Sequence, residues 1–232
     1  MKRLEGKVVI VTGGGRGIGK ATALFLAKEG ADITIISRTQ KELESTRGEI
    51  EKFGVNCITV RGDVSKRADV ERCIKETIQK FGRIDILINN AGILDVGEFV
   101  DMKEESWRGI IEVNVNGLMM FTQQVLPHMI EKKSGVIVNV SSGAGKTGFE
   151  ELAAYCASKF AVIGFTESLA QEVADKGVRV YAICPGSTDT KMWWDFASSP
   201  PAYKPEHVAK NILEMCLPGC RLKPGSSPYV KK

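Results

Sequence analysis

The sequence lacks the features that mark metal-binding, membrane-bound or secreted proteins. Its six cysteines are scattered over 232 residues without a Cys-x-x-Cys pair, and its two histidines, His128 and His207, lie far apart. This spacing argues against a zinc or redox motif, so no metal site is expected. No apolar run reaches the roughly 18 residues of a membrane span. Residues 1–14 are typical of a first strand and not of a signal peptide. We therefore expect a cytoplasmic protein with reduced thiols and no membrane partner.

The sequence also has no large excess of charge of either sign. The 32 basic and 28 acidic residues are mixed along the chain and leave a net charge of +4, which is too small to favour nucleic acid as a partner. Hydrophobic residues make up 43% and charged residues 26% of the sequence, as in ordinary globular proteins. These values exclude disordered, collagen-like and disulfide-scaffold classes.

Short β-branched runs alternate with longer helical stretches. We expect strands at 8–12, 33–36, 57–60, 84–89, 136–140 and 178–184, and helices at about 17–29, 40–53, 66–81, 104–130, 152–175 and from 205. Apolar strands separated by helices predict a parallel sheet covered on both faces. The chain should therefore form one α/β domain, a doubly wound Rossmann sheet of six or seven strands. A seventh strand at 228–230 and a loose tail remain equal alternatives, because this end is rich in Pro, Gly and Ser.

A glycine-rich loop directly follows the first expected strand and opens a helix. Its pattern is Thr12-Gly13-x3-Gly17-x-Gly19, which is neither Gly-x-Gly-x-x-Gly nor a Walker A loop. Glycines let the backbone approach a pyrophosphate, and a helix N-terminus favours negative charge. The loop therefore predicts a dinucleotide site, and the alternative is a tight turn that binds nothing.

Further motifs follow in order along the chain. They are Asp63, Asn89-Asn90-Ala91-Gly92, Asn114, Ser142, Tyr155-x3-Lys159 and Pro185-Gly186. Together with the glycine loop, this series resembles the short-chain dehydrogenase/reductase family, in particular its short NADP(H)-dependent 3-oxoacyl-thioester and carbonyl reductases. The resemblance covers residues 7–190, and most of these motifs follow expected strands, beyond which ligands of open α/β sheets bind.

The resemblance implies a set of catalytic and cofactor-binding residues. The implied catalytic residues are Asn114, Ser142, Tyr155 and Lys159. The implied cofactor-binding residues are Gly13, Gly15, Arg16, Gly17, Ile18, Gly19, Ser37, Arg38, Asp63, Val64, Asn90, Ala91, Gly92, Tyr155, Lys159, Pro185, Gly186, Thr188 and Thr190. In relatives, the residue at the position of Asn114 anchors a water molecule that extends a proton relay from the lysine.

Tyr155 and Lys159 are four residues apart on an expected helix, so their side chains share one face. A nearby ammonium favours the phenolate, and we expect it to lower the pKa of Tyr155 from about 10 to about 7. Ser142 lies 13 residues earlier, where its hydroxyl would stabilise a substrate oxyanion. Each residue alone also fits an ordinary structural role; the four together favour catalysis.

The end of the second strand predicts the cofactor. It carries Ser37 and Arg38 and no carboxylate, whereas an acidic residue there would bind the ribose of NAD. A guanidinium suits a 2′-phosphate, and Arg16 would add a second positive charge. NADP(H) is therefore the preferred cofactor, with NAD(H) as the alternative.

Aromatic side chains gather after the sixth strand, where relatives carry a substrate lid. Trp193, Trp194, Phe196 and Tyr203 lie within the expected lid, at about 187–204, and a C-terminal helix and tail follow over 205–232. These rings either line an apolar pocket or pack on the body or on another subunit. Residues 117–121 and 161–165 are nearly apolar all round, which predicts a homodimer or homotetramer.

The predicted function is NADP(H)-dependent hydride transfer between nicotinamide and a small carbonyl or alcohol substrate, favouring reduction of a ketone or aldehyde. One alternative is an NAD-dependent alcohol or polyol dehydrogenase, which Ser37 argues against. The other is a catalytically silent dinucleotide-binding module, which the intact Ser142, Tyr155 and Lys159 argue against.

Overall fold

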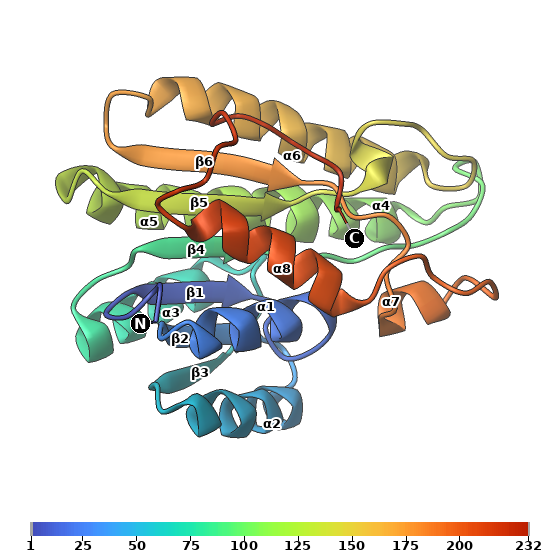
Figure 1. Ribbon diagram of the computed structural model, residues 1–232. Helices are drawn as coiled ribbons and strands as arrows, with labels where there is room; N and C mark the ends of the chain where they lie inside the picture. Colours follow the sequence, from blue (N-terminus) through green and yellow to red (C-terminus); the bar gives the residue numbers. More distant parts are fainter. Residues whose placement is uncertain (1, 232) are drawn as a thin grey trace.

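The strands form one parallel sheet with the order β3-β2-β1-β4-β5-β6 (Figure 1). The computed structural model describes residues 2–231. The strands are β1 (Val8–Thr12), β2 (Asp32–Ser37), β3 (Cys57–Arg61), β4 (Ile86–Asn89), β5 (Gly135–Val140) and β6 (Val178–Ile183). The predicted single-domain α/β fold is confirmed, and the sheet has six strands.

Helices cover both faces of the sheet. The helices of the described residues are α1 (Gly17–Lys28), α2 (Gln40–Ile50), α3 (Arg67–Phe81), α4 (Glu104–Ile111), α5 (Leu118–Glu131), α6 (Ala153–Glu172), α7 (Lys191–Trp194) and α8 (Pro205–Cys216), of which the short α7 lies beyond the ends of the strands. Side chains alternate across a strand, so Val9 and Val11 of β1 pack with α1, α2 and α8, whereas Ile10 packs with α3, α5 and α6. Each face therefore has its own apolar core, which explains why the strands are continuously hydrophobic.

Two expected elements differ from the structure. The helix expected at 104–130 is interrupted by a π-helical segment, Glu112–Gly117, between α4 and α5. The C-terminal tail follows the edge of β6 through backbone hydrogen bonds, but as far as Lys231 it makes only one parallel bridge, between Cys184 and Tyr229. Proline lacks a backbone N–H, so Pro228 cannot donate to a regular ladder.

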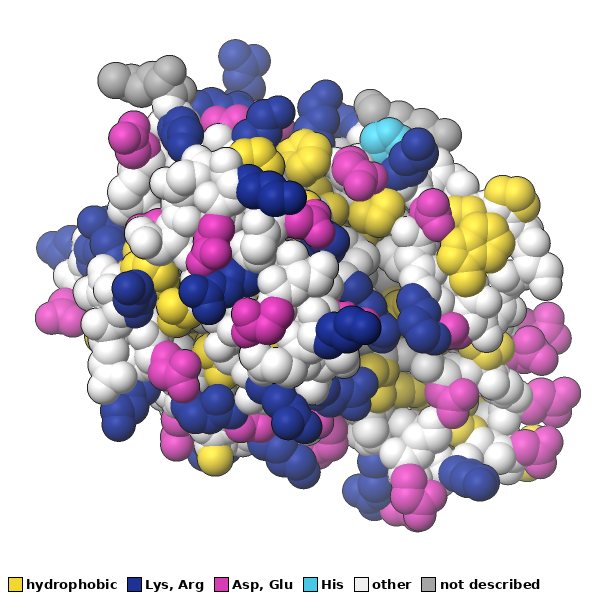
Figure 2. Space-filling model, turned by 90° about the horizontal axis from the view of Figure 1, so that it is seen from below, with side chains coloured by type: hydrophobic (Ala, Val, Ile, Leu, Met, Phe, Trp, Pro, Cys, Tyr) yellow, Lys and Arg dark blue, Asp and Glu magenta, His cyan; other side chains and the backbone are white. Residues whose placement is uncertain are grey.

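Charges of both signs are interspersed on the surface. Figure 2 views the molecule from below Figure 1 and shows Lys and Arg side chains mixed with Asp and Glu over that whole face. Within residues 2–231, no helix combines the length and the apolar character that crossing a membrane requires.

The strand order reverses at the neighbouring strands β1 and β4. The chain crosses over in one direction from β1 to β3 and in the other from β4 to β6, so the connecting loops diverge beyond the carboxyl ends of β1 and β4. Open α/β sheets bind ligands in the crevice that this divergence leaves.

Candidate active site

A cavity of about 1130 Å³ opens at the carboxyl ends of the strands. Its walls come from the glycine loop, the ends of the strands, the start of α6 and the segment after β6. The cavity brings together every site residue predicted from the sequence except two, Gly19 and Asn114, which lie just behind its wall.

The glycine loop leaves an open, uncapped helix terminus at this cavity. Gly17 begins α1 with a φ of +55°, a conformation that favours glycine. A Cβ on Gly19 would lie 2.2 Å from the carbonyl oxygen of Gly13, so α1 packs directly on the loop. The helix has no capping side chain and no acidic residue in its first turn. Its free N–H groups therefore fit a pyrophosphate.

Asn90 ties the glycine loop to the end of β4. Its side-chain amide donates to the carbonyl oxygens of Thr12 at 2.9 Å and Gly13 at 3.3 Å. The Thr12 hydroxyl in turn accepts from the backbone N–H groups of Asn90 and Ala91, at 2.9 and 3.0 Å. These bonds hold the two loops of the crevice in one fixed arrangement.

The end of β2 carries an unsatisfied polar atom. The hydroxyl oxygen of Ser37 is buried and has no hydrogen-bond partner among the described residues. Beside it, Arg38 is exposed, and no ion pair within residues 2–231 involves its guanidinium. A buried hydroxyl normally has a partner, so this end of the cavity fits a polar ligand such as the ribose end of a dinucleotide.

Tyr155 and Lys159 lie on the first turns of α6, against the end of β5. Lys159 is buried and its Nζ donates to the carbonyl oxygen of Val140 at 3.0 Å. The same Nζ lies 5.6 Å from the centre of the Tyr155 ring. Ser142 follows β5, and its Oγ accepts from the Ala144 backbone N–H at 3.2 Å. The side chains of Ser142, Tyr155 and Lys159 all line the cavity.

The pKa values of this group differ from the expectation. Burial raises the pKa of Tyr155 to about 12, and hydrogen bonding with Ser142 only partly opposes this rise. Burial lowers the pKa of Lys159 to about 8. This structure therefore does not have the expected lowering of the Tyr155 pKa to about 7, because removal from water outweighs the hydrogen bond with Ser142.

Asn114 lies in the π-helical segment and is buried behind Gly92. Its Oδ1 accepts from the backbone N–H of Ile93 at 2.8 Å, and its Nδ2 donates to the carbonyl oxygen of Ile93 at 2.9 Å and to the Ser158 hydroxyl at 3.1 Å. The side chain thus connects the β4 loop to α6. π-Helical segments are frequent at functional sites.

The segment after β6 brings aromatic rings to the mouth of the cavity. Trp193, Trp194 and Phe196 line it, and the Trp193 and Phe196 rings meet edge to face at 5.2 Å. Tyr203 does not line the cavity; its backbone pairs with Ser187 and Asp189. Phe149, from the loop before α6, adds a further exposed ring to the lining. Aromatic rings from two segments therefore contribute to the cavity lining.

Glu42 also lines the cavity, and sequence reasoning missed it. It lies in the first turn of α2, and its carboxylate forms an ion pair with Arg16 at 3.4 Å. An acidic residue in a first turn is ordinary because it complements the helix dipole, so its spacing gave no signal. The structure thus brings a carboxylate to the end of β2 where the strand itself has none.

Comparison with known proteins shows which family has a similar sequence. Residues 7–200 match the family model for short chain dehydrogenase. The 3-oxoacyl-[acyl-carrier-protein] reductase FabG of Thermotoga maritima is 42% identical over 197 residues, which cover 82% of this chain and 77% of the relative. The corresponding reductase of Synechocystis is 39% identical over 201 residues, covering 86% and 81%.

Two solved structures superpose closely on the chain. One is levodione reductase, with a TM-score of 0.93 and 27% identity, covering 99% of this chain and 97% of that one. The other is the 3-ketoacyl-(acyl-carrier-protein) reductase of Brucella melitensis complexed with NADH, with a TM-score of 0.92 and 33% identity, covering 98% and 97%.

The relatives, the fold and the cavity agree, and they resolve the choice between an enzyme and a silent binding module. The chain belongs to the short-chain dehydrogenase family and is an NAD(P)-dependent oxidoreductase that transfers a hydride between nicotinamide and a carbonyl/alcohol pair.

Proposed function

We propose that this oxidoreductase prefers NADP(H) and works mainly as a ketone reductase, with Tyr155 as its proton donor. The observation that carries the proposal is the convergence of Ser142, Tyr155 and buried Lys159 on one wall of the cavity whose other end holds Arg16 and Arg38. A proton donor and a cofactor cradle in one cavity are what carbonyl reduction requires.

The bound nicotinamide supplies the hydride, and the side chains handle the proton. Burial raises the pKa of Tyr155 to about 12, so at neutral pH the side chain carries the proton that a carbonyl oxygen would accept. Ser142 stabilises the developing oxyanion by a hydrogen bond. Lys159, hydrogen-bonded to Val140, sets the electrostatic surroundings of the phenol.

The remaining predicted residues bind the cofactor in this proposal. The glycine loop and the start of α1 would hold the pyrophosphate, and Ser37, Arg38 and Arg16 would hold the 2′-phosphate. Asp63 and Val64 would hold the adenine, and Asn90, Ala91 and Gly92 the adenosine ribose. Pro185, Gly186, Thr188 and Thr190 would hold the nicotinamide amide. All of these residues line the cavity.

The proposed substrate is a small ketone with an apolar body. Phe149, Trp194 and Phe196 line the mouth of the cavity with exposed fractions of 52%, 50% and 41%, and covering such rings is favourable for an apolar ligand. Keto substrates also appear in the names of the similar proteins, the 3-oxoacyl reductases and levodione reductase.

The test replaces Tyr155 with phenylalanine, which keeps the ring and removes the proton. Tyr155→Phe should lower kcat for ketone reduction by at least about 10²-fold. Binding of NADPH, followed by its fluorescence, should be retained. The assay measures NADPH and NADH consumption against a panel of ketones, diketones, sugars and β-ketoacyl thioesters. Near-full turnover of the variant would remove Tyr155 from the mechanism.

The same panel separates the cofactor alternatives. The Brucella melitensis reductase was solved with NADH, and an NAD-dependent alcohol dehydrogenase would reach a higher kcat/KM with NADH and in the oxidation direction. A higher kcat/KM with NADPH for ketones supports the proposal, and the reverse order overturns it.

A further inference from the structure

Glu42 brings a negative charge to the part of the cavity that is assigned above to the 2′-phosphate. Its Oε1 lies 3.4 Å from the Arg16 Nη1. A Cβ placed on Gly15 would lie 3.0 Å from the Ser37 hydroxyl oxygen and 3.5 Å from the Glu42 Oε2. The carboxylate, the unpartnered hydroxyl and the glycine loop therefore surround one small space.

The helix that carries Glu42 is fixed against the loop. The hydroxyl of Thr46, one turn further along α2, donates to the carbonyl oxygen of Gly15 at 3.0 Å. Lys20 of α1 pairs with Glu49 of α2 at 2.8 Å. These two contacts hold α2 in place, so the Glu42 carboxylate stays beside the loop when a ligand enters.

We propose that Glu42 is a specificity-determining residue that weakens the preference for NADP(H). Its carboxylate competes with the 2′-phosphate for Arg16, and it repels that phosphate directly. The inference rests on the proposed function, because it requires the phosphate to lie beside Arg16 and Arg38.

The charges around this space give the direction of the effect. Two guanidinium groups and one carboxylate leave a net charge of +1, and removing the carboxylate would leave +2. Like charges a few ångströms apart repel, but solvent screens the effect here because the Glu42 side chain is 33% exposed. For a ligand without the 2′-phosphate, the same carboxylate is an acceptor for a ribose hydroxyl, so it acts in favour of NAD(H).

The experiment measures binding of two nucleotide fragments by calorimetry, without turnover. The probes are adenosine 2′,5′-bisphosphate and 5′-AMP, which differ by the 2′-phosphate. Glu42→Gln keeps the size of the side chain and removes its charge. We expect the variant to bind the bisphosphate about tenfold more tightly, the low end of a charge-assisted contact, while its affinity for 5′-AMP does not rise.

A matched control comes from the end of the same helical region. Glu51 pairs with Arg47 at 2.7 Å, with side-chain exposures of 44% and 43%, and neither residue lines the main cavity. Glu51→Gln makes the same change of charge in the same kind of ion pair. It should leave the affinities for both nucleotides unchanged.

A third variant, Arg38→Gln, separates the two hypotheses. If it weakens bisphosphate binding and Glu42→Gln does not strengthen it relative to 5′-AMP, the role of Glu42 is overturned and the proposed cofactor preference stands. If none of the proteins binds the bisphosphate more tightly than 5′-AMP, the proposed preference and the inference both fail.

Discussion

Lys159 places an ammonium group in a buried position at the wall of the cavity, and this has a cost in stability. Its side chain is buried, and burial lowers its pKa to about 8 from an ordinary value of 10.5. The unfolded chain therefore binds more protons between about pH 8 and 10.5, so stability rises with pH across this window. Below pH 8 the full cost applies, about 3 kcal/mol.

Lys159→Met should therefore stabilise the chain at pH 7. The variant loses the hydrogen bond to Val140, worth about 1 kcal/mol, so we expect a net gain of about 2 kcal/mol at pH 7. The gain should disappear by about pH 10.5. Urea unfolding at both pH values measures it, with the exposed Lys176→Met as control. A gain that is equal at both pH values would show that the ammonium is not the cause.

The same residues show what can be predicted from the sequence at the scale of single residues. The spacing of Tyr155 and Lys159 placed both side chains on one face of a helix, and the structure agrees. The spacing did not predict the direction of the Tyr155 pKa, because a helical period reports which residues are neighbours and not how much water they lose. The position of Glu42 in the cavity could not be predicted from local spacing either, because its contact with Arg16 joins residues that are 26 positions apart in sequence.

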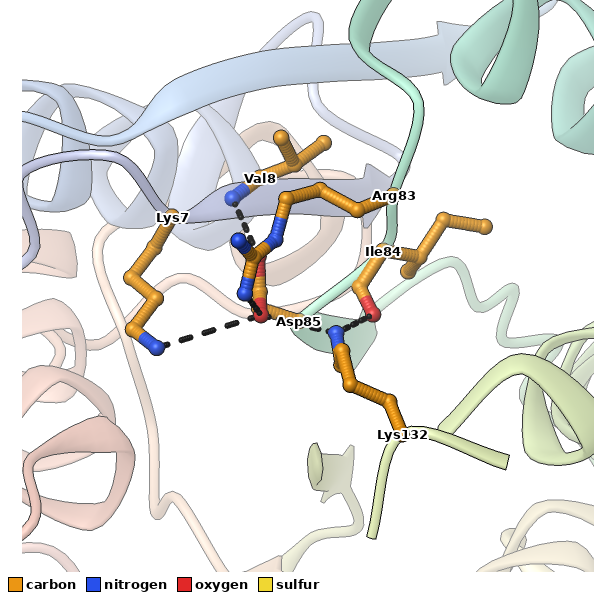
Figure 3. Close-up of polar contacts among 6 residues, drawn as sticks. All are labelled: Lys7, Val8, Arg83, Ile84, Asp85 and Lys132. Carbon is orange, nitrogen blue, oxygen red and sulfur yellow. Dashed lines mark hydrogen bonds and ion pairs between the residues drawn. The ribbon is translucent and has the colours of Figure 1, made fainter. Parts of the chain in front are cut away.

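At the scale of elements, Asp85 joins the amino ends of β1 and β4, opposite the active site. Figure 3 shows its carboxylate facing three cationic side chains. Arg83 donates at 2.7 and 2.8 Å and Lys132 at 2.8 Å, Lys7 lies 3.9 Å away, and the backbone N–H of Val8 donates at 3.0 Å. Burial alone would raise the pKa of Asp85, but these hydrogen bonds outweigh it and lower the pKa.

Asp85→Asn should destabilise the fold by about 3 kcal/mol at pH 7, because it leaves several cationic groups without their counter-charge. A lowered pKa means that the contribution of the carboxylate is complete above its unfolded value of about 4 and is lost as pH falls through the folded value. The difference between wild type and variant should therefore shrink below pH 4. Urea unfolding at several pH values measures this.

The exposed pair of Glu51 and Arg47 provides the comparison for Asp85. Glu51→Gln should cost less than about 1 kcal/mol, as surface ion pairs do. Equal losses in Asp85→Asn and Glu51→Gln would mean that the Asp85 cluster adds nothing beyond an ordinary surface pair.

The segment around α7 is the basis of a prediction about substrate binding. The two indoles are held by hydrogen bonds, Trp193 to the Ser199 carbonyl at 2.8 Å and Trp194 to the Asp189 carboxylate at 2.7 Å. If this segment is the substrate lid, Trp194→Ala should raise KM for bulky ketones several-fold and leave NADPH binding unchanged. Steady-state kinetics with a bulky and a small ketone measure this. Equal effects on both ketones would contradict a role in the pocket wall.

Helices and strands could be predicted from the sequence where the periodicity of apolar residues is strong. They could be predicted less well where tertiary contacts determine the local conformation. Every strand and the helices on both faces follow from the alternation of apolar runs. The π-helical segment at 112–117 did not; its buried Asn114 bonds to Ile93, a loop residue that is 21 positions away in sequence. The sequence of the tail is compatible with both a strand and a loose segment, because its prolines limit pairing with β6.

At the scale of the whole molecule, one helix has apolar side chains on its solvent face. Ala157, Phe160, Ala161 and Gly164 of α6 are exposed and follow a spacing of three and four residues, so they form one stripe. Phe160 is 47% exposed, and Met119 of α5 is 37% exposed. The small residues of the stripe would let a second helix approach closely, which is what a two-fold contact between identical helices needs.

We therefore expect a homodimer or homotetramer that buries this stripe. Light scattering at micromolar concentration should give at least twice the mass of one chain. Phe160→Glu would place a charge inside the contact, and burying it without a partner is costly, so the variant should dissociate to monomers that remain folded by circular dichroism. Phe53→Glu changes another partly exposed phenylalanine, 36% exposed and far from α6 in sequence, and it should leave the oligomer intact. A wild-type protein that stays monomeric would mean that the stripe on α6 is solvated, and that the apolar character of 161–165 serves only to pack α6 on the sheet.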